Sequence, residues 1–182
     1  MAKNDEFRVI ISIVALILAL GIFLGGYKLY NVYGVEEPLK EAIAERDTVE
    51  AVQVSKDGKT YNINISLKKI TNLQKEYLEI EKIICNKIEP GSFKLAVKGK
   101  STQELDELQS SLKMALYEAL ANNRFVWLEN EMASRIDHDR FSYRLYVDER
   151  HLYLQIEDGS GYWYEIFDRY RPETRTNADR EA

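Results

Sequence analysis

The chain opens with an unbroken apolar stretch and then changes to shorter alternating and helical patterns. Residues 9–27 read VIISIVALILALGIFLGGY and contain no charged side chain. As a helix this stretch is about 28 Å long at 1.5 Å per residue, close to the roughly 30 Å hydrocarbon core of a bilayer. It is apolar around its whole circumference, which is typical of a membrane span and not of a buried globular helix. We therefore expect a transmembrane helix that is retained as an anchor.

A cleaved signal peptide is the alternative interpretation, because the stretch starts soon after Met1 and follows Lys3 and Arg8. The apolar run is longer than the roughly 7–15 residues usual for a signal peptide, and no A-x-A-like cleavage site follows it. Positive charge is nearly balanced across the two flanks, but a short charged N-terminus before a first span usually stays inside. We expect residues 1–8 in the cytoplasm and the C-terminal domain outside the cell membrane.

Amphipathic side chains follow the apolar stretch. Tyr27, Tyr30 and Tyr33 recur at intervals of three with Lys28 among them, which is typical of the lipid headgroup region. We expect these residues to mark the outer end of the span, and residues 28–37 to form a juxtamembrane linker.

Gly21 and Gly25 form a G-x-x-x-G pattern inside the apolar stretch. Such a pattern allows two membrane helices to approach closely, so these glycines are candidates for a helix–helix contact. Lipid-facing glycines are the alternative interpretation, because small residues are common in membrane spans.

The pattern over residues 38–97 predicts the order helix, hairpin, helix, strand. A short helix from Pro38 to Arg46 precedes two alternating segments, Val49–Ser55 and Tyr61–Leu67, which flank an Asp-Gly turn. A capping box at Thr71–Gln74 then opens an amphipathic helix. The apolar stripe of that helix comprises Ile70, Leu73, Tyr77, Ile80, Ile84 and Ile88, and the third strand carries Phe93, Leu95 and Val97.

The remainder predicts one or two helices followed by three antiparallel strands. A capping box at Ser101–Glu104 opens a helix that Asn122-Asn123 should break, and a second helix is expected from Phe125 to Ile136. Three alternating segments then form a meander: 141–147, 152–156 and 162–166. We thus predict an α+β domain over residues 38–168, with lobes at about 38–100 and 101–168, and a disordered polar tail over residues 169–182.

The net charge and the cysteine content exclude some partners and some kinds of site. The formal net charge is −5, so the chain repels phosphate backbones and nucleic acid is not an expected partner. The single cysteine, Cys85, excludes an internal disulfide and a thiolate metal cluster.

Residues of the types that catalyse reactions are sparse. Asp137, His138 and Asp139 are the one cluster with metal-ligand chemistry, and His151 or Glu129 could supply a further ligand. The alternative interpretation is a charged turn after a helix. Phosphate-binding glycine loops and the G-x-S-x-G pattern do not occur. We expect no catalytic residue, no cofactor and no enzymatic activity.

Aromatic residues of the meander suggest a binding surface. If Val147 and Leu152 bracket the first turn, Tyr146 lies opposite Tyr153, and we expect Trp163 and Phe167 on that same face. An exposed aromatic patch of this kind would dock a partner protein. The alternative is that helices and the other lobe cover both faces of the sheet.

The element order of residues 38–97, following one apolar span, resembles the αββαβ ring-building motif of bacterial secretion and sporulation proteins. The resemblance covers about a third of the chain and implies an assembly domain outside the cytoplasmic membrane that packs against copies of itself or related subunits. The meander is not part of that motif.

Three hypotheses for function follow. The first is a membrane-anchored, non-enzymatic interaction or assembly module that faces outward, with the bilayer and a protein as partners. The second is an envelope hydrolase, metal-dependent or carboxylate-based, acting through Asp137, His138 and Asp139. The third is a sensor that binds a small ligand between its lobes.

Overall fold

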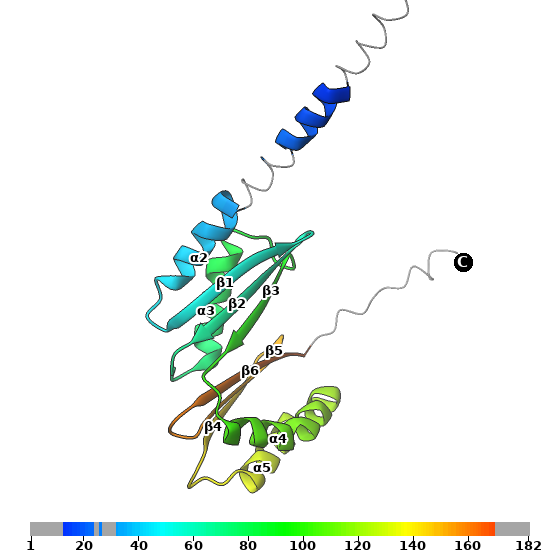
Figure 1. Ribbon diagram of the computed structural model, residues 1–182. Helices are drawn as coiled ribbons and strands as arrows, with labels where there is room; N and C mark the ends of the chain where they lie inside the picture. The colour runs from blue at the N-terminus through cyan, green and yellow to red at the C-terminus, as the bar shows by residue number, and fades with distance from the viewer. Residues whose placement is uncertain (1–12, 24–25, 27–31, 170–182) are drawn as a thin grey trace, which may run out of the picture.

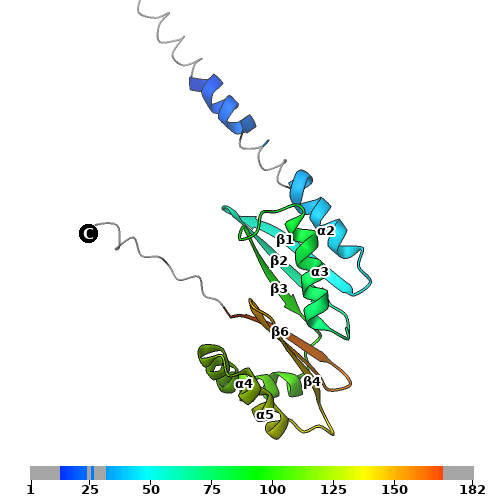
Figure 2. The same cartoon turned by 180° about the vertical axis from the view of Figure 1, so that it is seen from behind.

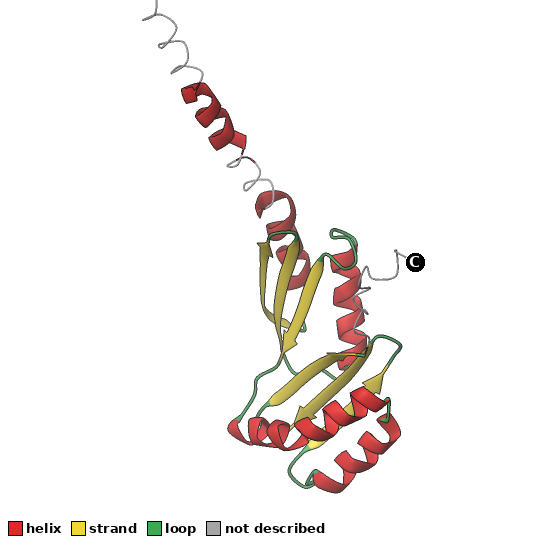
Figure 3. Cartoon of the chain, turned by 90° about the vertical axis from the view of Figure 1, so that its right-hand side faces the viewer, coloured by secondary structure: helices red, strands yellow, loops and turns green. Residues whose placement is uncertain are grey.

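The computed structural model describes residues 13–23, 26 and 32–169 and has a mixed α+β fold (Figure 1). Two three-stranded sheets lie one beyond the other along the chain (Figure 3), with strand orders β1-β2-β3 in sheet A and β4-β5-β6 in sheet B. Helices α2 and α3 cover one face of sheet A, as Figure 2 shows, and α4 and α5 lie at the far side of sheet B. The predicted αββαβ order, the two helices and the three-stranded meander are confirmed.

Residues 13–23 form a helix whose large apolar side chains are all exposed. Those side chains, from Ile13 to Phe23, are between 50% and 76% exposed. Within the described residues, no helix combines the length and the apolar character needed to cross a bilayer. Part of the predicted span 9–27 lies outside those residues, as do Gly25, Tyr27, Lys28 and Tyr30.

The second half of the expected linker over residues 28–37 is helical. A π-helical turn, η1 (Val32–Glu36), contains Tyr33 and continues directly into α2 (Glu37–Ala44). Proline at the start of α2 is compatible with the helix, because the first N–H groups of a helix have no intrahelical partner. The apolar side of α2, Leu39 and Ile43, is fully buried.

Sheet A contains the predicted hairpin and adds a parallel strand to it. Strand β1 (Val49–Asp57) pairs antiparallel with β2 (Thr60–Leu67), and Gly58 takes a positive φ of 58° in the tight turn. Strand β3 (Phe93–Lys98) pairs parallel with β2. The inward-facing side chains of β2, buried as the alternation predicts, are Tyr61, Ile63, Ile65 and Leu67.

Helix α3 (Leu73–Cys85) crosses over sheet A and connects β2 to β3. Its predicted stripe is confirmed, since all six residues from Ile70 to Ile88 are buried. The predicted capping box at Thr71–Gln74 is wrong by one residue: Asn72 caps the helix by accepting a 2.8 Å hydrogen bond from the N–H of Lys75.

Sheet B is covered on one side by α4 (Gln103–Asn122) and α5 (Phe125–Arg135). Its strands are β4 (Ser142–Val147), β5 (His151–Glu157) and β6 (Tyr162–Asp168). Thr102, not Ser101, caps α4, and Asn123 ends this helix at a left-handed φ of 53°, close to the predicted break.

The two sheets share side chains at their junction. Tyr153 and Tyr164 on sheet B belong to the core of sheet A, and they are 0% and 2% exposed. The Tyr164 hydroxyl accepts from the N–H of Ile70 at 2.9 Å and donates to the carbonyl of Lys68 at 3.2 Å. Gln155 Nε2 donates to the Ile70 carbonyl at 2.7 Å. Sheet B therefore holds the loop between β2 and α3.

The predicted tail begins one residue too early. The backbone N–H of Arg169 donates to the carbonyl of Arg150 at 2.8 Å, and its guanidinium lies 4.6 Å from the Phe125 ring centroid. Arg169 therefore belongs to the folded domain. Residues 170–182 of that expected tail lie outside the described residues.

Candidate functional site

The four aromatic residues predicted to form one exposed patch lie on opposite faces of sheet B. Tyr146 pairs with Tyr153 as expected, but Tyr153 pairs with Ile166, while Trp163 pairs with Ile156. The four-residue turn between β5 and β6 pairs odd positions with even ones, so the predicted face for Trp163 and Phe167 is wrong.

Both pairs of aromatic residues pack against other elements of the fold. Tyr146 and Tyr153 pack toward sheet A, whereas Trp163 and Phe167 pack with α4 and α5. Tyr153 is 0% and Trp163 is 7% exposed. The alternative interpretation, that the other lobe and the helices cover the two faces, is the one the structure supports.

Asp137, His138 and Asp139 form an exposed turn after α5. The Asp137 carboxylate accepts the N–H of Asp139 at 3.1 Å, and His138 Nε2 lies 3.2 Å from the carbonyl of Ala133. His151 lies on the opposite face of sheet B, against Tyr153. The described residues contain no group of three or more His, Cys, Asp or Glu side chains that could hold a metal ion. The structure thus gives the predicted metal cluster no support.

A polar cluster at the lobe junction is the main gathering of titratable groups that sequence reasoning missed. The Tyr153 hydroxyl donates to Asp148 at 2.7 Å and lies 3.2 Å from His151 Nδ1. His151 Nε2 is 3.4 Å from Asp168, and the Tyr77 ring packs edge-on against His151 at 5.2 Å. His151 is 7% exposed, so this histidine is held on every side by protein.

The cluster is electrostatically satisfied. Burial raises the pKa of Asp148, but hydrogen bonds from Tyr153 and from the N–H groups of His151 and Arg150 outweigh burial and lower it. Burial, followed by the Asp148 carboxylate, raises the pKa of Tyr153 well above its usual range. Arg150 forms a bidentate pair with Glu81 on α3 at 2.9 and 2.5 Å. These groups fix the β4–β5 turn against α3.

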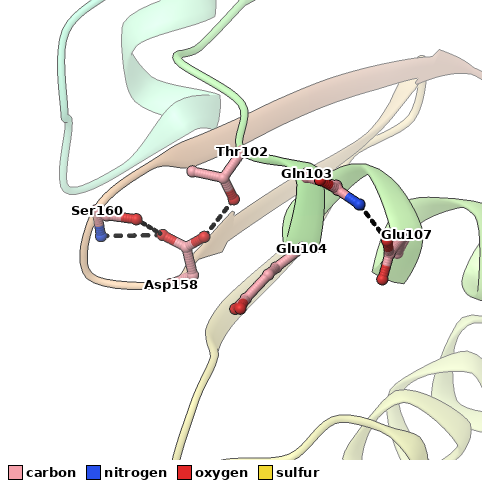
Figure 4. Close-up of a pocket in the computed structure, with 6 residues that line it drawn as sticks. All are labelled: Thr102, Gln103, Glu104, Glu107, Asp158 and Ser160. Carbon is pink, nitrogen blue, oxygen red and sulfur yellow. Dashed lines mark hydrogen bonds between the residues drawn. The ribbon is translucent and has the colours of Figure 1, made fainter.

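A polar hollow of about 540 Å³ lies at the start of α4, lined by Thr102, Gln103, Glu104, Glu107, Asp158 and Ser160 (Figure 4). Asp158 accepts hydrogen bonds from the Thr102 hydroxyl and from the N–H groups of Ser160 and Gly161. The Asp158 carboxylate thus already accepts hydrogen bonds that connect the β5–β6 turn to the N-cap of α4.

A smaller cleft lies between α4 and β6. It has a volume of about 100 Å³ and is lined by Gln109, Lys113, Leu116, Tyr117, Trp163, Glu165 and Phe167. Glu165 lies between Trp163 and Phe167 on the helix-facing side of β6, and its carboxylate accepts a long hydrogen bond from Gln109 Nε2 at 3.5 Å. Burial raises the pKa of Glu165 above its ordinary value. The signal in the sequence was one acid on an otherwise apolar strand face.

The face of sheet A away from α2 and α3 is open, and the carboxylate in its paired rows is that of Asp57, opposite Thr60 at the hairpin end. Its other three rows are Ser55, Asn62 and Lys94; Gln53, Asn64 and Ala96; and Ala51, Ser66 and Lys98. Lys94 and Lys98 on the edge strand β3 are exposed. Exposed glutamates lie elsewhere: Glu41 on α2 and Glu45 at its C-cap follow the partly exposed Glu37 at intervals of four.

No protein-family model, no curated protein and no solved structure matches this chain. The resemblance to ring-building motifs accordingly rests on the element order alone.

Proposed function

We propose that this chain is a membrane-anchored, non-enzymatic assembly module, with residues 9–27 in the bilayer and the α+β domain on the extracytoplasmic side. The observation that carries the proposal is the helix at residues 13–23. Its large apolar side chains are at least 50% exposed, whereas the apolar stripes of α2 and α3 are buried. Exposing this much contiguous apolar surface to water is unfavourable, and hydrocarbon is the solvent that removes the cost.

Anchoring is tested by fractionating cells that express the full chain. We expect the wild-type chain to stay in the membrane fraction after washing with high salt and with carbonate. Replacing Leu16 and Leu20 together by Lys places two charges in the apolar stretch and should release the chain. Replacing them by Ile is the matched control and should leave it bound. Recovery of the intact wild-type chain from the soluble fraction would contradict the proposal.

The surface we assign to assembly is the open face of sheet A, and its proposed occupant is α2 of a second copy. On β3, Lys94 and Lys98 are about 13 Å apart at 3.3 Å per residue. The row from Glu37, at the start of α2, to its C-cap residue Glu45 extends about 12 Å at 1.5 Å per residue. The charges are opposite, although Glu37 already pairs with Lys40 at 3.4 Å. Complementary charges of this kind fix the orientation of the two copies more than they raise the affinity between them.

Charge reversal tests this contact. We expect Lys94→Glu with Lys98→Glu to abolish crosslinking between copies in membranes, and Glu41→Lys with Glu45→Lys to do the same. Co-expressing the two double variants should restore crosslinking between them, because the charges are complementary again. Lys87→Glu, an exposed change beyond α3, is the control and should have no effect. If reversal leaves crosslinking unchanged, this face is not the contact.

The two other hypotheses have less support. The Asp137–Asp139 turn that a hydrolase would use projects into solvent. The junction where a sensor would hold its ligand is filled by Tyr153, Tyr164 and Gln155, each at most 2% exposed.

A further inference from the structure

We propose that the cleft between α4 and β6 binds a small organic ammonium cation, with Glu165 as the counter-charge and the rings of Tyr117, Trp163 and Phe167 as its walls. This inference is independent of the anchoring and assembly proposed above, because the cleft lies on sheet B and α4, away from the open face of sheet A.

The first argument is that Glu165 lacks a cationic partner. Among the described residues, no Lys or Arg nitrogen lies within 4.0 Å of its carboxylate, and the amide of Gln109 is 3.5 Å away. Two other acids of this domain that are largely shielded from solvent are paired: Glu76 with Arg46 at 2.7 Å, and Glu157 with Lys69 at 2.7 Å. A half-buried carboxylate without such a partner is costly, so a ligand cation would be stabilising there.

The second argument is the character of the walls. Phe167 and Tyr117 meet edge to face with ring centroids 6.5 Å apart, and Trp163 lies on the same strand face as Phe167. The faces of aromatic rings attract cations, and alkylated ammonium groups are the ones such rings recognise best because they are weakly hydrated. A carboxylate among aromatic rings therefore selects a positive, apolar head group over a neutral or anionic one.

The third argument is size. A volume of about 100 Å³ accommodates a head group such as trimethylammonium, and it is too small for a sugar or nucleotide. Tyr117, which lines the cleft, is 56% exposed, so this wall is accessible from solvent.

Lys113 is the group that competes with a ligand. It lines the cleft, and its charge lowers the pKa of Glu165 against the effect of burial. Its ammonium makes no ion pair with Glu165 within 4.0 Å, but it would repel an incoming cation. Removing this charge should therefore strengthen binding, which gives the experiment a variant with the opposite sign.

The test uses the full chain in a maltoside detergent, which has no ammonium group, with Trp127→Phe so that Trp163 is the one fluorescent tryptophan. The probe is choline, and its neutral isostere 3,3-dimethylbutan-1-ol is the control ligand. We expect choline, but not the alcohol, to change Trp163 fluorescence in a saturable way. Glu165→Gln should weaken choline binding about tenfold or more, and Lys113→Met should strengthen it.

Glu104→Gln removes an exposed carboxylate outside the cleft and should leave binding unchanged. Binding should also weaken on acidification of wild type, as Glu165 takes up its proton, and this dependence should disappear in Glu165→Gln. Equal responses to choline and to the alcohol, no response to choline, or choline affinity unchanged in a folded Glu165→Gln variant would each overturn the proposal. Thermal unfolding of each variant establishes that it is folded.

Discussion

The Tyr164 hydroxyl on β6 accepts a hydrogen bond from the backbone N–H of Ile70, 2.9 Å away, across the junction between the two sheets. The same hydroxyl donates to the Lys68 carbonyl, so one side chain satisfies two backbone groups of the loop that leads into α3. Buried backbone groups rarely go unpaired, which makes this side chain a structural requirement of the junction.

Replacing Tyr164 by Phe should therefore lower the free energy of unfolding by about 1–3 kcal/mol, the cost of leaving buried polar groups unpaired. Urea denaturation followed by circular dichroism measures it. Tyr117→Phe, on an exposed side chain, is the control and should shift the midpoint little. Equal midpoints for the wild-type chain and Tyr164→Phe would show that the junction does not depend on this hydroxyl.

Gly161→Ala should destabilise the contact between the β5–β6 turn and the start of α4. An added Cβ would lie 2.7 Å from the carbonyl oxygen of Lys100 and 2.7 Å from Thr102 Cγ2. Relief requires the β5–β6 turn to move away from the start of α4, at a cost of about 1–3 kcal/mol. Thermal unfolding would detect the change as a lower Tm. An unchanged Tm would mean that this turn shifts freely.

Arg46→Met should be destabilising because it strands the carboxylate of Glu76, which is 8% exposed and accepts from Arg46 at 2.7 Å and Thr48 at 2.6 Å. We expect a loss of about 1–3 kcal/mol in chemical denaturation. Adding Glu76→Leu to Arg46→Met should recover part of it, since no buried charge then lacks a partner. A double variant less stable than either single variant would refute this account.

Acid should weaken the hydrogen bonds by which Asp158 connects the β5–β6 turn to α4. Burial raises the pKa of Asp158, but hydrogen bonds from Thr102, Gly161 and Ser160 outweigh burial and lower it to about 2. A lowered pKa in the folded state gives stability that is present above the unfolded value, near 4, and is lost as the pH falls toward 2. In Asp158→Asn the free energy of unfolding should be lower at neutral pH and should fall less steeply over this range. An acid dependence identical to that of the wild-type chain would show that the ionised Asp158 carboxylate does not stabilise the fold.

Alkali should destabilise the fold through its buried tyrosines. Burial raises the pKa of Tyr77, Tyr153 and Tyr164 well above the usual value near 10. A raised pKa in the folded state contributes stability below the unfolded value and loses it as the pH rises. We expect part of the tyrosinate absorbance to develop together with the loss of circular dichroism. Complete titration of every tyrosine in a still folded protein would contradict the observed packing.

Much of the fold could be predicted because its elements alternate or repeat cleanly. Ile63, Ile65 and Leu67 alternate on one strand, and Ile80 and Ile84 repeat on one helix, so burial follows from local periodicity. For α3 and α4, the sequence pattern predicts an N-cap one residue before the one in the structure. Asn72 and Thr102 had neighbours of equal capping ability, and the choice at Thr102 involves Asp158, far away in the sequence.

The aromatic face could not be assigned without the register of β6. Trp163 and Tyr164 are adjacent, and a slip of one position exchanges the faces they occupy. The contacts of Glu165 and Tyr153 likewise depend on which helix covers which face, a property that periodicity does not contain.

The shared core of the two sheets also has a mechanical consequence. Because Tyr153 and Tyr164 are inserted from sheet B into the interior of sheet A, the halves cannot swing about a hinge without first opening that interior. A rotation of sheet A would therefore carry sheet B with it, so we expect the two sheets to move as one body.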